Sequence, residues 1–227
     1  MQIVLNRHIE SVLNDIADAC PNDTAAFLIA GSVRDAIVGK RTFPKDLDIK
    51  VAGDMPGLCN ALRKNGYKYL QILARRRTRR MKKPSAPLLD ISQLAGSSAT
   101  AIRRWIKSCD FTVNAVALQL TNRKIVAHKD AIKHIMSKEL HVCAKKVPYN
   151  TRIFAAVRLI GKGYNPPPAQ EVKALVSELK GISKKDYDHA VAKTLWRLGF
   201  DKSTVRHAVD KLRLNFDLLS YKAVKKL

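Results

Sequence analysis

Two aspartates spaced two residues apart are the side chains in this chain best suited to metal chemistry. Asp46 and Asp48 alternate with Leu47 and Ile49 in the sequence. Alternation along a β-strand places both carboxylates on one face and both apolar side chains on the other. A solvated strand edge is the alternative, but aspartates inside an apolar strand oppose β propensity. Because carboxylate oxygens suit divalent cations, we predict a metal site at Asp46 and Asp48.

A phosphate-binding turn is predicted just before these aspartates. Residues 25–30 are apolar, which is typical of a buried strand, and a helical pattern follows directly. Gly31 and Ser32 therefore lie at a strand-to-helix turn, where backbone N–H groups favour a phosphate. Arg34 suits either a contact with a triphosphate or a pairing with neighbours that braces the turn. The sequence leaves these two roles open.

The elements that position these residues form a mixed α/β head followed by helices. Strands are predicted at 25–30, 47–51, 67–73, 88–91, 113–120 and 124–127. Helices are predicted around Ile9, Val12, Leu13 and Ile16, and at 32–38, 56–65, 100–108, 131–140, 151–161, 170–179, 187–198 and 203–212. Residues 75–84 lack an apolar period and are predicted to form a loop or hairpin tip.

Charge is distributed unevenly along the 227 residues. Residues 1–60 hold 6 Lys and Arg against 8 Asp and Glu, a net of −2, and the remainder holds 36 against 11, a net of +25. A basic surface of this size favours a polyanionic partner, although a merely solubilising surface is the alternative. The four cysteines show no metal-binding spacing, which favours reduced thiols. No apolar run is long enough to span a membrane and the first helix is amphipathic, so a cytoplasmic location is expected.

Three ordered blocks resemble a known family. They are Gly31-Ser32-Val33-Arg34-Asp35, then Lys45-Asp46-Leu47-Asp48-Ile49, then Cys109-Asp110-Phe111-Thr112-Val113-Asn114-Ala115. Together they resemble the polymerase-beta-type nucleotidyltransferase superfamily, and within it the class II CCA-adding enzymes and bacterial poly(A) polymerases. The resemblance implies an α+β fold, with a mixed-sheet catalytic head at residues 1–145 and an all-helical neck and RNA-binding tail at residues 146–227.

The resemblance also implies roles for individual positions. Asp90 lies where related sequences carry a third catalytic carboxylate beside Asp46 and Asp48. The implied nucleotide-binding residues are Gly31, Ser32, Arg34, Asp110, Asn114, Tyr149 and Arg152. Basic residues expected to contact RNA are Arg75, Arg76, Arg77, Arg79, Arg80, Lys82 and Lys83.

The chain departs from the family pattern at two places. Ser108 and Cys109 replace two arginines that the family places before Asp110. The family's neck motif E-D-x-x-R aligns with residues 148–152, where Tyr149 stands in the position of the Asp. A tyrosine stacks on any base, which favours looser nucleotide selection. Residues 195–209 resemble a helix-turn-helix, with an ordinary helical hairpin as the alternative.

These observations predict a template-independent RNA nucleotidyltransferase that adds nucleotides from NTPs to RNA 3′ ends, with tRNA as the expected substrate. Two Mg²⁺ ions and an NTP, ATP or CTP, are the implied cofactor and substrate. A nucleotidyltransferase toxin or host-take-over factor that modifies tRNA would share this active site. A non-catalytic RNA- or DNA-binding protein on a degenerate polymerase fold is the alternative from another class.

Overall fold

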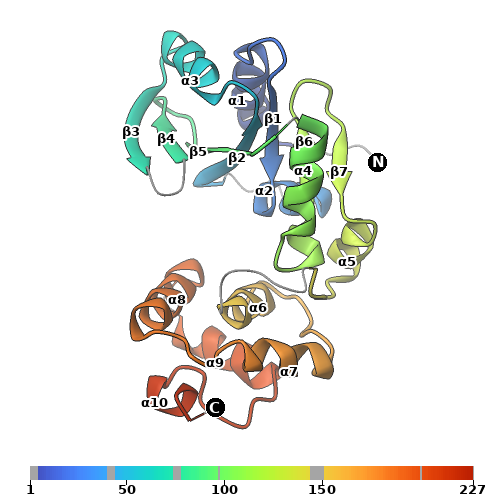
Figure 1. Ribbon diagram of the computed structural model, residues 1–227, viewed down its shortest axis with the longest axis vertical. Helices are drawn as coiled ribbons and strands as arrows, with labels where there is room; N and C mark the ends of the chain where they lie inside the picture. Colours follow the sequence, from blue (N-terminus) through green and yellow to red (C-terminus); the bar gives the residue numbers. More distant parts are fainter. Residues whose placement is uncertain are drawn as a thin grey trace. The chain divides into compact units, whose positions relative to one another are not determined.

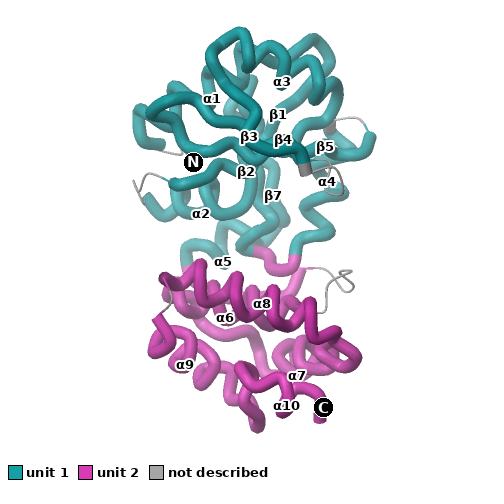
Figure 2. Tube along the Cα trace, turned by 90° about the vertical axis from the view of Figure 1, so that its left-hand side faces the viewer, with its two compact units in different colours: residues 1–109, 113–136 teal, residues 110–112, 137–227 magenta. Residues whose placement is uncertain are grey.

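The computed structural model describes residues 5–39, 44–73, 78–96, 98–143, 151–199 and 201–226. The chain divides into two compact units (Figure 2). The head unit comprises residues 1–109 and 113–136, and the tail unit comprises residues 110–112 and 137–227. Among the described residues, no helix is both long and apolar enough to cross a membrane.

The head unit is built on one mixed sheet with helices around it (Figure 1). Its strands are β1 (Ala25–Ile29), β2 (Asp46–Ala52), β3 (Lys68–Leu73), β4 (Thr78–Lys82), β5 (Leu88–Gln93), β6 (Val116–Gln119) and β7 (Ile125–Ala127). Its helices are α1 (Arg7–Asp18), α2 (Gly31–Ile37), α3 (Met55–Lys64), α4 (Ser98–Lys107) and α5 (Ala131–Ser137). The strand order is β3-β4-β5-β2-β1-β6-β7, and among these described strands only the β2–β5 pair is parallel.

The core of the head forms because apolar side chains fall at the periods of its elements. Ile9, Val12, Leu13 and Ile16 share one face of α1 and are all buried, as the sequence predicts. On β2, Leu47 and Ile49 are completely buried. Helix α1 packs on α3, α3 contacts β5, and α4 contacts β2, β6 and β7. Helices α3 and α4 thereby pack directly on strands of the sheet.

The tail unit is helical. It contains α6 (Arg152–Ile160), α7 (Ala169–Ser177), α8 (Lys184–Arg197), α9 (Lys202–Lys211) and α10 (Tyr221–Val224). Helix α6 is apolar on nearly all sides and packs against α7, α8 and α9. Gly199, with φ 68°, separates α8 from α9, and Asp201 caps α9 by accepting a hydrogen bond from the Ser203 N–H. The predicted turn between two helices is confirmed at this position.

Most predicted elements are present, and three expectations need correction. Residues 75–84 were expected to be a loop or hairpin tip, but Thr78–Lys82 form strand β4 between β3 and β5. The region expected as a strand from Val113 begins with a 3₁₀ turn at Thr112–Asn114, and the strand starts only at Val116. The short helix α10 was not predicted. The α+β fold class is confirmed.

Candidate active site

Three carboxylates lie on one face of the sheet. Asp46 and Asp48 are two residues apart on β2, and Leu47 between them is completely buried on the opposite face. The parallel register of β2 and β5 places Asp48 directly beside Asp90. Neighbouring strands are about 4.8 Å apart, so these side chains are within reach of a common ligand. The predicted same-face placement of the two aspartates on β2 is confirmed, and β5 brings the third to them.

A guanidinium group lies beside these carboxylates. Arg80 of β4 is the register partner of Asp90 and donates two hydrogen bonds to it, from Nε to Oδ1 at 2.7 Å and from Nη2 to Oδ2 at 2.9 Å. Hydrogen bonding to Asp90 raises the pKa of Arg80, and the charges of Asp46 and Asp48 raise it further. Arg80 therefore belongs to the carboxylate site, a placement that the sequence did not predict.

Lys50 is a second cation near the carboxylates that sequence reasoning missed. It follows Asp48 by two residues on β2, so both side chains share a face of the sheet. Burial lowers the pKa of the Lys50 ammonium, and the nearby Asp48 charge partly offsets that effect. The alternation that identified Asp46 and Asp48 also applies to Lys50, so the signal was present in the sequence.

The turn before α2 has an unusual backbone conformation. Ala30 adopts φ 51° and ψ −114°, a region that L side chains rarely occupy. Gly31 begins α2, and among the described residues beyond its immediate chain neighbours, an added Cβ there would meet Arg34 Nη2 at 3.6 Å. Within the described part of the chain, the contact to an added side chain at this position would therefore be the end of a side chain and not backbone. Helix α2 has only seven residues, so any phosphate contact depends on the turn's own N–H groups and little on a helix dipole.

Arg34 braces this turn from within. Its side chain is only 4% exposed, and its Nη1 donates a hydrogen bond of 2.5 Å to Asn114 Oδ1. Its Nε also lies 3.6 Å from Asp35 Oδ1. Of the two roles that the sequence left open, the geometry favours bracing. Asn114 is thereby placed beside α2, and Cys109, 8% exposed, has Sγ 3.6 Å from the Asn114 carbonyl oxygen.

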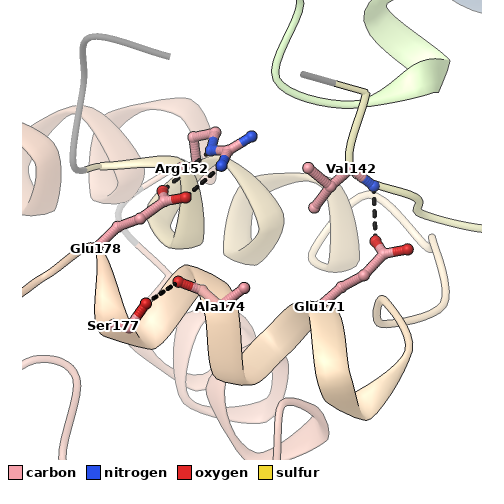
Figure 3. Close-up of polar contacts among 6 residues, drawn as sticks. All are labelled: Val142, Arg152, Glu171, Ala174, Ser177 and Glu178. Atoms are coloured by element: carbon pink, nitrogen blue, oxygen red, sulfur yellow. Dashed lines mark hydrogen bonds and ion pairs between the residues drawn. The ribbon is translucent and has the colours of Figure 1, made fainter. Parts of the chain in front are cut away.

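The arginine of the predicted neck motif lies in the interior of the tail unit. Arg152 begins α6, is 5% exposed, and binds Glu178 at the end of α7 through two hydrogen bonds (Figure 3). The bond from Arg152 Nε to Glu178 Oε2 is 3.0 Å long. Arg158 donates a 3.1 Å hydrogen bond to Thr194 Oγ1, and its pKa is lowered by burial. Arg152 and Arg158 thus both have partners inside the tail unit.

Asp110 of the third sequence block also belongs to the tail unit. Its Oδ1 accepts a 2.8 Å hydrogen bond from the Phe111 N–H, and its carbonyl oxygen accepts one from the Cys143 N–H. Its charge partly offsets the lowering of the pKa of Arg158. The Asp110 side chain is half-buried at a position held by backbone pairing of Phe111 with Val142.

The basic residues predicted to bind RNA fall into two groups. Arg75, Arg76 and Arg77, like Tyr149 of the nucleotide-binding set, lie outside the described residues. The described members mostly have partners within the head: Arg79 donates to the Tyr69 hydroxyl at 3.2 Å, Arg80 binds Asp90, and Lys83 Nζ lies 2.9 Å from Asp15 Oδ2. Lys82 is exposed. Folding of β4 therefore uses side chains that the sequence suggested were available for RNA.

The donor set on β2 fits a divalent metal ion. Asp46 is half-buried and Asp48 is exposed, so both carboxylates sit at the surface of a rigid strand. Hard cations such as Mg²⁺ take oxygen ligands, and a pair of carboxylates is a common protein contribution to an Mg²⁺ site that also binds substrate phosphates. The chemistry of these residues suits the Mg²⁺ that the sequence resemblance implies.

Solved structures share this architecture. A tRNA-processing enzyme in an apo form superposes with a TM-score of 0.70 at 18% identity, covering 100% of this chain and 63% of that one. The fold of this chain is that of the matched part of this enzyme. A CCA-adding enzyme in complex with CTP gives a TM-score of 0.68 at 16% identity, covering 90% of this chain and 50% of that one. The Thermotoga maritima CCA-adding enzyme complexed with tRNA gives 0.66 at 16% identity, covering 89% and 50%.

These likenesses confirm the fold that the three sequence blocks imply. The chain spans about half to three-fifths of the length of these proteins. No protein-family model and no curated protein sequence matches the chain. At this level of identity the likeness establishes the fold, and an activity has to rest on the chemistry of the site.

Proposed function

We propose that this chain is a template-independent RNA nucleotidyltransferase that adds nucleotides from NTPs to RNA 3′ ends, with tRNA as its substrate. The observation that carries the proposal is the placement of Asp46, Asp48 and Asp90 on one face of the sheet in a nucleotidyltransferase fold. The similar CCA-adding enzymes were solved with tRNA, CTP and ATP. A fold alone does not determine function, so the carboxylate arrangement is the decisive support for an activity.

Asp46 and Asp48 are the residues that would hold the metal ions in this proposal. Bound Mg²⁺ would supply a lowered pKa for the attacking RNA hydroxyl and charge neutralisation for the departing pyrophosphate. The turn at Gly31 and Ser32 is the proposed contact for the triphosphate, because its backbone N–H groups lie where a strand meets a helix. Arg34 and Asn114 keep that turn in place.

Base selection is proposed to be looser than in a CCA-adding enzyme. The residue that the family uses with an aspartate to read the base corresponds here to Arg152, and its guanidinium is bound to Glu178 inside the tail unit. Tyr149 replaces the aspartate. Hydrogen-bonding groups that are already satisfied discriminate poorly between bases, whereas stacking on an aromatic ring accepts any base. We therefore expect more than one NTP to be incorporated at comparable rates.

The test is an extension assay with total tRNA and one labelled NTP at a time, in the presence of Mg²⁺ or EDTA. Incorporation that needs metal and is abolished in Asp48→Asn supports the proposal. Asp188→Asn is the matched control, because Asp188 is an exposed carboxylate that pairs with Lys184 on the surface of α8. Incorporation of no nucleotide into any RNA, with RNA binding retained, would instead support the non-catalytic binding protein. Strict ordered addition of C, C and A would contradict the proposed loose selection.

A further inference from the structure

The third carboxylate of the site is held by an arginine. Both oxygens of Asp90 accept hydrogen bonds from Arg80, at 2.7 and 2.9 Å, in the two-pronged geometry that a guanidinium and a carboxylate prefer. The side chains of Asp90 and Arg80 are 16% and 35% exposed, so water competes only partly for this contact. Strand register supports the pair, because Arg80 and Asp90 are directly opposite on β4 and β5.

This ion pair places a positive charge beside the carboxylates that would bind a cation. Asp90 lies beside Asp48 in the β2–β5 register, so the Arg80 guanidinium is a fixed positive charge next to the metal-binding pair. The pKa of Arg80 responds to Asp46 and Asp48 as well as to Asp90, which agrees with their proximity. Each oxygen of Asp90 already accepts a hydrogen bond from Arg80, so a metal ion bound to Asp90 would lie against the positive charge of the guanidinium.

We propose that Asp90 positions Arg80 instead of binding metal, and that Arg80 weakens the binding of free divalent cations at Asp46 and Asp48. The metal then binds well only together with the triphosphate, whose negative charge offsets the guanidinium. This inference rests on the metal site of the proposed function and adds its regulation. Arg80 is a positioning and charge-setting residue, because its two-pronged contact is with Asp90 and it acts on the metal through its charge.

Mn²⁺ binding to the full chain without nucleotide, followed by electron paramagnetic resonance, tests the proposal directly. Arg80→Gln should tighten Mn²⁺ binding roughly three- to tenfold, because one positive charge beside a divalent ion is removed in a partly screened environment. Arg79→Gln is the matched control: it removes the same charge one residue away on the opposite face of β4, where Arg79 contacts Tyr69. The Mn²⁺ affinity of Arg79→Gln should differ from that of the parent protein by less than about twofold. Unchanged or weaker binding in Arg80→Gln overturns the proposal.

Further variants separate positioning from ligation. Asp48→Asn should weaken Mn²⁺ binding more than about tenfold, whereas Asp90→Asn should weaken it by less than about threefold. Equal losses in these two variants would make Asp90 a ligand and refute the proposal. Arg80→Lys keeps the positive charge but removes the two-pronged contact with Asp90, so it should tighten Mn²⁺ binding less than Arg80→Gln. Circular dichroism melts confirm that each variant is folded.

A non-hydrolysable NTP analogue completes the test. The parent protein should bind Mn²⁺ much more tightly with the analogue than without it, and Arg80→Gln should show a smaller ratio of the two affinities. Equal ratios in the two proteins contradict the inference. The readout here is Mn²⁺ affinity, which does not depend on nucleotide transfer. If the variants show the expected changes in Mn²⁺ affinity but the protein transfers no nucleotide, the proposed function is refuted and the role of Arg80 still holds.

Discussion

Removing the carboxylate that binds Arg152 should destabilise the tail unit. Arg152 is 5% exposed and Glu178 is 26% exposed, so Glu178→Gln leaves a guanidinium almost fully buried without its counter-charge. Breaking a fully buried ion pair costs about 3–5 kcal/mol. Because Glu178 is partly solvated and the glutamine oxygen still accepts one hydrogen bond, we expect a loss of about 2 kcal/mol.

Urea unfolding of the tail unit measures this loss. The chain has two tryptophans, Trp105 on α4 of the head and Trp196 on α8 of the tail. A Trp105→Phe background makes the fluorescence of Trp196 report on the tail unit, with circular dichroism as a second probe. With a slope of about 1–3 kcal/mol per molar urea, the expected loss lowers the midpoint by about 1 M.

Glu171 provides a matched control on the same helix. It is 25% exposed, close to the value for Glu178, and its Oε2 accepts a 2.7 Å hydrogen bond from the Val142 N–H (Figure 3). Glu171→Gln keeps an acceptor for that N–H and removes no carboxylate from an arginine. It does remove the charge that lies 3.4 Å from His141 Nδ1, a partly exposed contact, so its cost should stay below about 1 kcal/mol.

Replacing both members of the pair distinguishes a buried charge from a general packing defect. The Arg152→Met, Glu178→Leu double variant should be more stable than Glu178→Gln, because apolar replacement of a whole buried pair is often neutral or stabilising. A Glu178→Gln midpoint equal to that of the parent, or a double variant less stable than the single one, would refute the assignment of Arg152 as a structural residue.

The strained turn, the arginine run and a helix cap each allow a test. Ala30→Gly should raise the unfolding free energy of the head by about 1 kcal/mol, because glycine adopts φ 51° and ψ −114° without strain; unchanged or lower stability in urea would contradict this. Replacing residues 75–77 by Ser should weaken RNA binding and flatten its salt dependence by about 0.7 log units for each phosphate that is no longer neutralised, whereas Ser at Lys222, Lys225 and Lys226 should not. An unchanged slope would move the RNA-binding role to the tail. Hydrogen bonds from Thr204 and Ser203 lower the pKa of Asp201 to about 2 from its ordinary 3.8. The contribution of the ionised Asp201 cap to the free energy of unfolding should therefore be present above about pH 4 and be lost as the pH falls toward 2. Asp201→Asn keeps the cap without the titration, and melts across this range should show a flatter profile; an equally steep profile would show that Asp201 is not responsible.

Elements whose side chains follow one clear period could be predicted from the sequence. Helix α1 buries the four apolar residues that its spacing predicts, and β2 buries Leu47 and Ile49 while Asp46 and Asp48 share the other face. Gly199 and Asp201 end one helix and begin the next as their residue types suggest. In each case the prediction needs only local sequence, because the spacing of apolar residues a few positions apart indicates which face is buried.

Strand β4 could not be predicted in that way. Met81 is its only fully buried side chain, and its arginines are satisfied by partners elsewhere, Arg79 by Tyr69 and Arg80 by Asp90. The run of arginines next to lysines was therefore predicted to form a loop or hairpin tip. The strand forms because β3 and β5 supply hydrogen bonds and side-chain partners on both sides, and these come from other parts of the chain.

Partners distant in sequence account for the rest of what the sequence did not reveal. Arg34 and Asn114 are 80 residues apart, and Arg152 and Glu178 are 26 apart. Periodicity shows which face a residue occupies but not which side chain meets it there. The motifs marked Arg34 and Arg152 for nucleotide binding, with a bracing role left open for Arg34, and the fold identified Asn114 and Glu178 as their partners.

Asp46 and Asp48 are central to the proposed metal-dependent nucleotidyl transfer. The most direct measurement is the single-turnover rate of labelled nucleotide incorporation into tRNA by Asp46→Asn and Asp48→Asn, relative to Asp188→Asn, with RNA affinity measured in parallel. Because metal catalysis contributes several kcal/mol, we predict a rate loss of roughly a thousandfold or more in both site variants, with RNA affinity nearly unchanged. Incorporation by both variants at the rate of Asp188→Asn would contradict the assignment of this site.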